Sequence, residues 1–505
     1  MKLLYIWAIL IISFLHLQCG NGDKNFVLAP IGSKSHKIFF MGITEALAKR
    51  GHQMTMVSSF EPSKTIDNIR EVVVQNFTLD HLMTNVFDES EQSKMMLSMF
   101  TETPALCVKA LGQPHIQALK NEKFDLVIVS AFLGSCFLSF VHHLKVPFIW
   151  ATPSGLMGSF HDRIGSIDVP AINLKMYFRT HSLCVESGLC PTDTPPFSEF
   201  DKNASLLIIN SVRTLEYPPR PGMPNAIYVG GAHIKPPKKL PKDSQDFIII
   251  HSFFSGEIVV VVVVVVVVVH DLAAKDLEDW VKGSGDEGFI FFSLGSAVNP
   301  DFLPEKVLWK WNKETMPDLP SNVKLQKWLP QPDLLGHPKI KLFITHGGLL
   351  STLESSYHGV PVIGIPVFGD QTTNMMEVEN EGWGRVMRWK ELEENTLREL
   401  ILDVLNNKKM TEIVKQKSVI MKDRLVPPDE EAAYWVEYVI RHKGAPHLRS
   451  PVFMMKWYEV YNMDVWAFII FVIVGTLFVS YLVIKFLLRK CFGIGKSKKD
   501  KRKKE

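Results

Sequence analysis

The chain has 505 residues, of which 46% are hydrophobic and 22% charged, which is enough for two or three packed domains and excludes a disordered chain or a lone small module. The net charge is +3, but residues 485–505 hold ten basic and two acidic side chains, so this tail carries +8 and the remainder −5. Because binding nucleic acid requires a broad cationic surface, the charge distribution excludes nucleic-acid binding by the part of the chain before the tail.

Residues 1–22 predict a secretory signal peptide. Lys2 precedes an uncharged apolar run over 3–15, and small or turn-forming residues follow at Cys19, Gly20 and Gly22. The run is too short to span a bilayer. The remaining chain is therefore predicted to enter the secretory pathway.

Residues 23–230 predict an α/β domain. Short apolar strands alternate with helical stretches, which favours a parallel sheet wrapped by helices. The predicted elements are strand 26–29, helix 37–50, and strands 53–58, 71–74, 126–129 and 148–151. Gly, Pro and polar clusters predict a loop-rich insertion over 155–200.

We place the domain linker at 231–287, where helices and central strands are interrupted by prolines. Seven prolines lie nearby: Pro218, Pro219, Pro221, Pro224, Pro236, Pro237 and Pro241. Residues 259–269 are eleven consecutive valines, a run without a natural packing register. Two explanations stay open: translated non-coding sequence or a gene-model error over 244–270, which we favour, and an exposed apolar loop.

Residues 288–445 predict a second parallel α/β domain. Two such facing domains form a cleft between the carboxyl ends of their strands. The predicted elements are strands 289–294, 307–311 and 342–345, helix 349–358, strand 362–365, and helices 372–381, 394–405 and 430–441. Only twelve residues, with two prolines, separate the first two strands, which is too few for a helical crossover. A helix is missing there, either from the protein or from the gene model.

A juxtamembrane stretch at 446–464 leads to a predicted transmembrane helix at 465–484. These twenty residues carry no charge, and about 20 apolar residues cross the hydrocarbon core. The basic tail 485–505 follows, and basic flanks stay cytoplasmic, so we predict a single-pass type I protein with a lumenal body. Lys501 and Lys503 resemble a dilysine endoplasmic-reticulum retrieval signal; the alternative is a plain stop-transfer flank.

The predicted lumenal body retains cysteines that form disulfides in an oxidising compartment: Cys107, Cys136, Cys184 and Cys190. The last two are close enough in sequence to bridge a local loop. Paired Cys-x-x-Cys or His spacing is absent from the sequence, so we predict no metal site. Asn76 and Asn203 begin glycosylation triplets that suit a lumenal body.

The chemistry concentrates in residues 341–374, KLFITHGGLLSTLESSYHGVPVIGIPVFGDQTTN. A buried strand leads through His346 and two glycines into a helix, whose N-terminal amides attract phosphate and whose glycines allow close approach. Glu354 is suited to accept two ribose hydroxyls, and Asp370 and Gln371 to bind sugar hydroxyls. Taken alone, a strand–Gly–Gly–helix fits a structural turn equally well.

The whole string resembles the signature of the UDP-glycosyltransferase family of animal endoplasmic reticulum. Residues 326–338, QKWLPQPDLLGHP, and 292–296, FSLGS, match the family as well, and the resemblance extends from the signal peptide to the basic tail. It implies the GT-B fold: two facing Rossmann-like domains, the N-terminal one for an acceptor and the C-terminal one for a UDP-sugar.

The resemblance also implies a donor site in the C-terminal domain. The implied contacts are Trp328 with uracil, Gln331 with the nucleoside, Glu354 with the ribose, Ser296, His346, Gly348 and Ser351 with the diphosphate, and Asp370 and Gln371 with the sugar.

His36 follows the first strand in the stretch GSKSH and opens the first helix. With a pKa near ~6.5, an imidazole takes a proton from a hydroxyl at neutral pH. By position alone His36 would be a helix-cap histidine. Similar family members use this histidine as the general base for an attack that inverts the anomeric carbon from α to β.

The sequence departs from the family at two positions. Related enzymes place an aspartate after the strand 126–129 to orient the base, whereas here only Ser130 and Ser135 are available as base partners. A serine bonds an imidazole but does not stabilise an imidazolium by charge, which predicts weaker catalysis. Ile209 stands where glucuronate-using relatives have an arginine, so glucose is the expected sugar.

The sequence therefore predicts a glycosyltransferase of the endoplasmic-reticulum membrane that moves glucose from UDP-glucose to a hydroxyl of a small lipophilic acceptor. UDP-sugar is a co-substrate, no cofactor or metal is expected, and one helix contacts lipid; an oligomer is compatible with the sequence. The alternative is a catalytically weak or silent UDP-sugar-binding paralogue. An adhesion protein is disfavoured, because regularly spaced sandwich strands are absent from the sequence.

Overall fold

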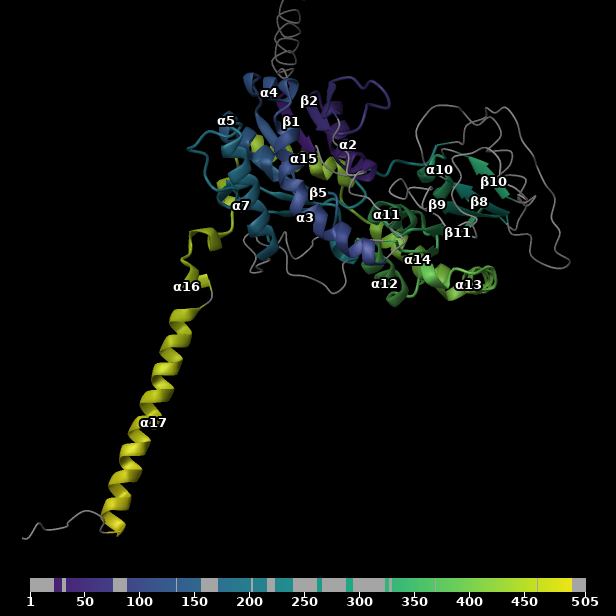
Figure 1. Ribbon diagram of the computed structural model, residues 1–505. Helices are drawn as coiled ribbons and strands as arrows, with labels where there is room; N and C mark the ends of the chain where they lie inside the picture. Colours follow the sequence, from purple (N-terminus) through teal and green to yellow (C-terminus); the bar gives the residue numbers. More distant parts are fainter. Residues whose placement is uncertain are drawn as a thin grey trace, which may run out of the picture. The chain divides into compact units, whose positions relative to one another are not determined.

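The computed structural model describes residues 22–29, 33–75, 89–132, 134–155, 171–200, 203–215, 223–238, 261–265, 288–293, 323–326, 329–367, 369–460 and 462–492. The chain divides into two compact units, Met1–Arg449 and Ser450–Glu505. Two parallel sheets lie in the first unit, and the long helix α17 (Met463–Phe492, yellow in Figure 1) lies in the second.

The first sheet has seven parallel strands in the order β3-β2-β1-β4-β5-β6-β7. The central strands β4 and β5 are buried along their whole length and are mostly apolar, because both faces of the sheet are covered. The strands are β1 Lys24–Ala29, β2 Gln53–Ser58, β3 Ile69–Val73, β4 Leu126–Ser130, β5 Phe148–Thr152, β6 Leu207–Ile209 and β7 Ala226–Tyr228. The first five were predicted to within two residues. The order reverses between β1 and β4, where ligands settle in such sheets.

Different helices cover the two faces of this sheet. One core contains side chains of α3, α5 and α7, and the other contains side chains of α2 and α15. The helices of this part are α2 Lys34–Lys49, α3 Glu89–Leu111, α4 Pro114–Ala118, α5 Leu138–Leu144, α7 Ala171–Glu186 and α8 Phe197–Phe200, with short 3-10 turns η2 Leu119–Asn121, η3 Ser135–Phe137 and η6 Arg213–Leu215.

Helix α15 (Pro428–Arg441) follows the second sheet in sequence but packs on the first, beside α2 (Figure 1). Arg50, at the end of α2, pairs with Glu430 at 2.6 Å and with Glu437 at 2.9 Å. The C-terminal end of the first unit is thus fastened to the N-terminal domain by a buried apolar face and by partly exposed ion pairs.

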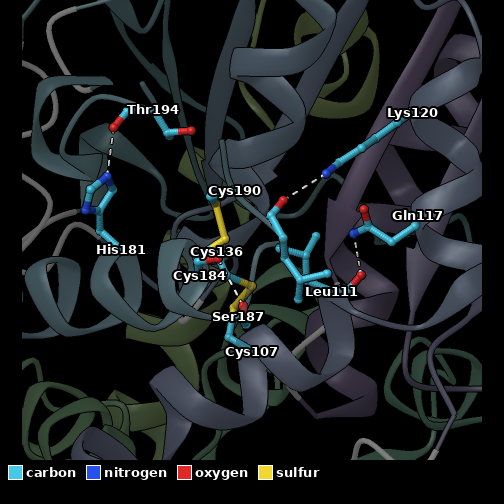
Figure 2. Close-up of a disulfide and its surroundings, with 11 residues drawn as sticks. Cys107, Leu111, Gln117, Lys120, Cys136, His181, Cys184, Ser187, Cys190 and Thr194 are labelled. Atoms are coloured by element: carbon cyan, nitrogen blue, oxygen red, sulfur yellow. Dashed lines mark hydrogen bonds between the residues drawn. A yellow bond between two sulfur atoms is a disulfide. The ribbon is translucent and has the colours of Figure 1, made fainter. Parts of the chain in front are cut away.

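The predicted loop-rich insertion at 155–200 is wrong for its second half, which contains α7 and α8. Amphipathic spacing in α7 outweighs the Gly and Pro clusters around it. Two disulfides brace this layer, Cys184–Cys190 and Cys107–Cys136 (Figure 2). The local bridge that the sequence indicated is confirmed, and the second one ties η3 to α3.

The second sheet has six parallel strands in the order β10-β8-β9-β11-β12-β13. Its strands are β8 Val261–Val265, β9 Phe289–Ser293, β10 Val323–Gln326, β11 Ile340–Thr345, β12 Val362–Gly364 and β13 Gly384–Val386. The helices around it are α10 Gln331–Leu335, α11 Leu349–His358, α12 Gln371–Asn380, α13 Glu394–Asn406 and α14 Lys408–Lys422, with the turn η8 Trp389–Glu391. Helix α11 begins and ends at the predicted residues.

Five valines of the run form β8, which pairs with β9 and β10. The predicted strand 307–311 lies outside the described residues. β10 starts at residue 323 and pairs with β8, so residues 294–322 separate it from β9. This length of 29 residues is sufficient for a helical crossover.

Among the described residues, α17 is the one helix long and apolar enough to cross a membrane. It contains the predicted span 465–484. Short turns and one helix precede it: η9 Pro446–Leu448, η10 Pro451–Met454 and α16 Trp457–Val460.

Gly42 lets helix α2 approach the segment that follows β7. A Cβ atom on Gly42 would lie 2.7 Å from the carbonyl oxygen of Ala232 and 3.0 Å from the Cα of His233. Ala232 is fully buried in the same core as α2. Any side chain at position 42 therefore has to move the backbone at 232–233.

We expect Gly42→Ala to lower the melting temperature of the full-length protein in detergent. In an ordinary helix interior, Gly→Ala stabilises the protein by about 0.5–1 kcal/mol, whereas overpacking costs about 1–3 kcal/mol. A loss of stability therefore indicates that the contact at Gly42 is tight. An unchanged or raised melting temperature, followed by circular dichroism, would show that this contact is not tight.

Candidate functional site

The turn between β11 and α11 presents the N-terminus of a ten-residue helix. Gly347 has φ +83°, and a Cβ there would lie 2.4 Å from the Met375 side chain, so the position requires glycine. Gly348 is the N-cap, and a Cβ on it would lie 2.6 Å from Nε2 of His346. The His346 ring thus lies against the helix N-terminus, whose first amides have no intrahelical acceptor.

Burial lowers the pKa of His346 to about 4, although a hydrogen bond to the backbone of Ser293 opposes this shift. The ring is therefore neutral at physiological pH. It offers an anion a hydrogen-bond donor rather than a positive charge, which leaves the helix amides as the main attraction for a diphosphate.

Gln331, Ser351 and Glu354 come together, as the sequence predicted for a nucleoside site. Gln331, the first residue of α10, donates from Nε2 to Oε2 of Glu354 at 2.7 Å and to Oγ of Ser351 at 3.0 Å. Glu354 is buried, with 5% of its surface exposed. A buried carboxylate flanked by an amide and a hydroxyl is suited to accept hydrogen bonds from neighbouring sugar hydroxyls.

Asp370 and Gln371 begin α12, next to the same turn. The side chain of Gln371 is buried and accepts a hydrogen bond from the Val367 amide at 2.9 Å. Asn374, which the sequence analysis did not single out, donates from Nδ2 to Asp370 Oδ2 at 3.1 Å and to the Gly347 carbonyl at 3.0 Å. The sequence did contain a signal for this contact, because Asn374 lies four residues after Asp370 and such side chains are neighbours on a helix. Asn374 fixes the two loops relative to each other.

His36 lies in the first turn of α2, just after β1. It is partly buried, its ring contacts Phe132 edge-on at 4.9 Å, and Nδ1 has no hydrogen-bond partner among the described residues. Burial lowers its pKa to about 4. The imidazole is available as a base at neutral pH, but as a weak one.

Neither serine is hydrogen-bonded to His36 within the described part of the chain. The Ser130 hydroxyl donates to the Phe132 carbonyl at 3.1 Å and accepts from the Phe132 amide at 3.3 Å. Ser135 is buried in η3. Phe132 follows β4 and contacts the His36 ring. Ser130 is closer to Phe132 in sequence than Ser135 is.

The residue after His36 was also missed. Lys37 pairs with Glu71 and donates to the carbonyls of Phe60 and Glu61, both at 2.9 Å. The lysine fastens the start of α2 to β3 and to the loop after β2. The local sequence around Lys37 gave no indication that this lysine pairs with Glu71.

Three predicted positions take no part in the described site. Ser296 and Trp328 lie outside the described residues. Ile209 is fully buried in the core of the first sheet, in strand β6 between β5 and β7, and its apolar side chain provides no cation for a sugar carboxylate; glucose as the sugar stays a prediction. Of the glycosylation positions, Asn203 is exposed and Asn76 is not described.

Groups of three or more His, Cys, Asp or Glu side chains that could hold a metal ion do not occur among the described residues.

Residues 23–276 and 265–499 match the family model described as UDP-glucoronosyl and UDP-glucosyl transferase. The chain belongs to this family. The two matched segments overlap at residues 265–276, which begin within the valine run of the linker. This UDP-glycosyltransferase is a glycosyl-transferring enzyme, and a UDP-sugar donor and an acceptor are its expected substrates.

Curated relatives match over nearly the whole chain. The UDP-glycosyltransferase UGT5 of Dactylopius coccus is 30% identical over 91% of both chains. The 2-hydroxyacylsphingosine 1-beta-galactosyltransferase of Homo sapiens is 30% identical over 92% of this chain and 89% of its own. UDP-glucuronosyltransferase 2B14 of Oryctolagus cuniculus is 28% identical over 90% and 92%, respectively.

The solved structures with a similar fold are glycosyltransferases. CalG4, the calicheamicin glycosyltransferase, superposes with a TM-score of 0.54 at 18% identity, covering 84% of this chain and all of its own. The glycosyltransferase of kitacinnamycin gives the same TM-score at 15% identity, covering 83% of this chain and 99% of its own. The UDP-glycosyltransferase therefore has the GT-B fold that the sequence predicted.

We expect Glu354→Ala to weaken UDP-sugar binding by about 1–3 kcal/mol, the usual cost of losing hydrogen bonds to a charged group. Calorimetric titration of the full-length protein with UDP measures the loss. Glu377→Ala, on the helix α12, is the matched control and should bind UDP normally. Unchanged affinity in Glu354→Ala would remove the carboxylate from the nucleotide site.

Proposed function

We propose that this UDP-glycosyltransferase transfers glucose from UDP-glucose to a hydroxyl of a small lipophilic acceptor, with inversion at the anomeric carbon. The observation that supports a nucleotide-sugar donor best is the buried cluster of Gln331, Ser351 and Glu354 beside the N-terminus of α11. In this proposal Glu354 binds the ribose, the α11 amides and His346 bind the diphosphate, and Asp370 and Gln371 bind the sugar.

The proposed reaction begins when His36 takes the proton from the acceptor hydroxyl. The acceptor oxygen forms a bond to the anomeric carbon as the bond from that carbon to the UDP oxygen breaks, and UDP leaves with the electron pair. Attack opposite UDP turns an α-glucoside donor into a β-glucoside product. His36 becomes an imidazolium for which the described structure provides no paired carboxylate, which limits the rate.

Glucose is proposed as the sugar because Asp370 carries an exposed carboxylate at the start of α12. A carboxylate accepts hydrogen bonds from neutral hydroxyls but repels the carboxylate of a glucuronate. A relative at 28% identity, from Dactylopius coccus, is named UDP-glucosyltransferase 2.

In competition binding, the protein is expected to bind UDP-glucose more tightly than UDP-glucuronate. Asp370→Asn should reduce the difference between the two affinities, because it removes the repulsion between the Asp370 carboxylate and that of glucuronate. Displacement of a labelled UDP by each nucleotide sugar gives both affinities. UDP itself is the control and should bind both proteins alike. The opposite ranking for the unmodified protein would exclude glucose as the preferred sugar.

His36 is expected to control activity without controlling donor binding. His36→Ala should lower kcat/KM by about 10²–10⁴, the usual contribution of a general base, while UDP still binds. His143→Ala, on an exposed histidine of α5, is the control. Equal activity of His36→Ala and the unmodified protein would rule out this base.

The same histidine sets the pH dependence. Because its pKa is about 4, His36 stays deprotonated above that value, so kcat/KM should be level from pH 6 to 8 and fall only as pH approaches 4. Ser130→Asp should raise the pKa of His36, so kcat/KM should begin to fall at a higher pH, and the value of kcat/KM on the plateau should increase. Ser135→Asp is the comparison variant. A protein that glucosylates nothing, even with either aspartate, would favour the silent UDP-sugar-binding paralogue.

We also propose that the body is lumenal in the endoplasmic reticulum and that 485–505 is cytoplasmic, with α17 as the anchor. The apolar length of α17 and the lysines and arginines at its end support this topology. In sealed microsomes, added protease should remove a tag at the C-terminus and leave the body intact. Digestion of the body before the membrane is opened would reverse the orientation.

A further inference from the structure

The segment 230–233 connects the first sheet to the donor domain and is held from two sides. On one side it packs against α2, where Gly42 allows its backbone to approach. On the other side Arg424, after α14, donates from Nη2 to the Gly230 carbonyl at 3.0 Å. Gly231 has φ +91°, which glycine adopts without strain, so the turn that leads to His233 is fixed by its sequence.

The His233 side chain is directed at the donor cluster. Only 1% of the side chain is exposed, and its Nε2 lies 3.4 Å from Oε1 of Glu354, whose side chain is 7% exposed. Neither ring nitrogen has a hydrogen-bond partner among the described residues. Burying an imidazole without a partner is costly, so a histidine at this position indicates a task for the ring.

The two oxygens of Glu354 have different neighbours. Oε2 accepts from Gln331, whereas Oε1 faces His233. With a single hydrogen-bond partner, the carboxylate group of Glu354 can rotate about the bond that joins it to the side chain, because this torsion has no sharp energy minima. A second donor on Oε1 removes this freedom, and each oxygen keeps a lone pair for a ligand hydroxyl.

We propose that His233 is a positioning residue of the nucleotide site: its ring, with a proton on Nε2, holds Oε1 of Glu354 so that the carboxylate meets both ribose hydroxyls. This role rests on the proposed binding of ribose by Glu354. Because the segment of His233 packs on α2, whose first turn contains His36, the ring also joins the donor carboxylate to the helix of the proposed base.

The test is calorimetric titration of full-length protein in detergent with UDP and with 2′,3′-dideoxy-UDP. The ratio of the two affinities measures what the ribose hydroxyls contribute. We expect His233→Leu to lower UDP affinity by about tenfold and leave dideoxy-UDP affinity unchanged, so the ratio falls. A general loss of structure would lower both affinities together.

Two substitutions of similar size separate positioning from packing. The amide nitrogen of a glutamine reaches the place of Nε2, whereas that of an asparagine reaches only the place of Nδ1. His233→Gln should therefore keep the ratio and His233→Asn should lose it. His143→Gln is the control, since this exposed histidine of α5 lies on the first sheet, away from the carboxylate.

An unchanged ratio in both His233→Leu and His233→Asn, with UDP still preferred, would overturn the role of His233 alone. Equal affinities for UDP and dideoxy-UDP in the unmodified protein would instead overturn ribose binding by Glu354, and the proposed role of His233 with it.

Discussion

Burial of the Glu354 carboxylate is the constraint around which the donor half of the protein is built. Taking an ionised carboxylate out of water costs several kcal/mol unless donors surround it. The groups around it come from separate parts of the chain: Gln331 of α10 donates to Oε2, and the His233 ring, from the segment after the first sheet, lies 3.4 Å from Oε1. A buried carboxylate with lone pairs left for ligand hydroxyls fits a nucleotide site.

The backbone around this carboxylate is determined by close packing. Gly347 takes a left-handed conformation against Met375, and a Cβ on Gly364 would lie 2.2 Å from the sulfur of the same methionine. These contacts draw α12 against the β11–α11 turn, where Asn374 joins Asp370 to the Gly347 carbonyl. The diphosphate-binding helix end and the proposed sugar-binding residues are thus set by one packed group.

Much of this arrangement was predictable from sequence, because its signals are local. Strand β2 and helix α11 begin and end at the predicted residues, since Gly51 and Gly359 punctuate clear apolar periods. Strands β6, β7 and β13 were missed because three residues show little period, whereas the equally short β12 lies within a longer apolar run and was predicted.

Other parts of the site depend on contacts between distant segments, which no local pattern reveals. His233 and Lys37 were missed for this reason, since their partners, Glu354 and Glu71, lie far away in sequence. The place of Ile209 in the buried sheet was not predicted either, because its strand β6 was not recognised. Ser130 and Ser135 remain the predicted substitutes for the aspartate, and burial of the His36 ring lowers its pKa.

The most direct test of a nucleotide site centred on Glu354 is hydrogen–deuterium exchange of the full-length protein with and without UDP. Bound UDP should slow exchange in three separate segments: α10, the first turns of α11, and residues 230–234. Helices α3 and α7, on the far face of the first sheet, should exchange as before. Protection confined to the first sheet, or absent from α10 and α11, would contradict a nucleotide held by this carboxylate.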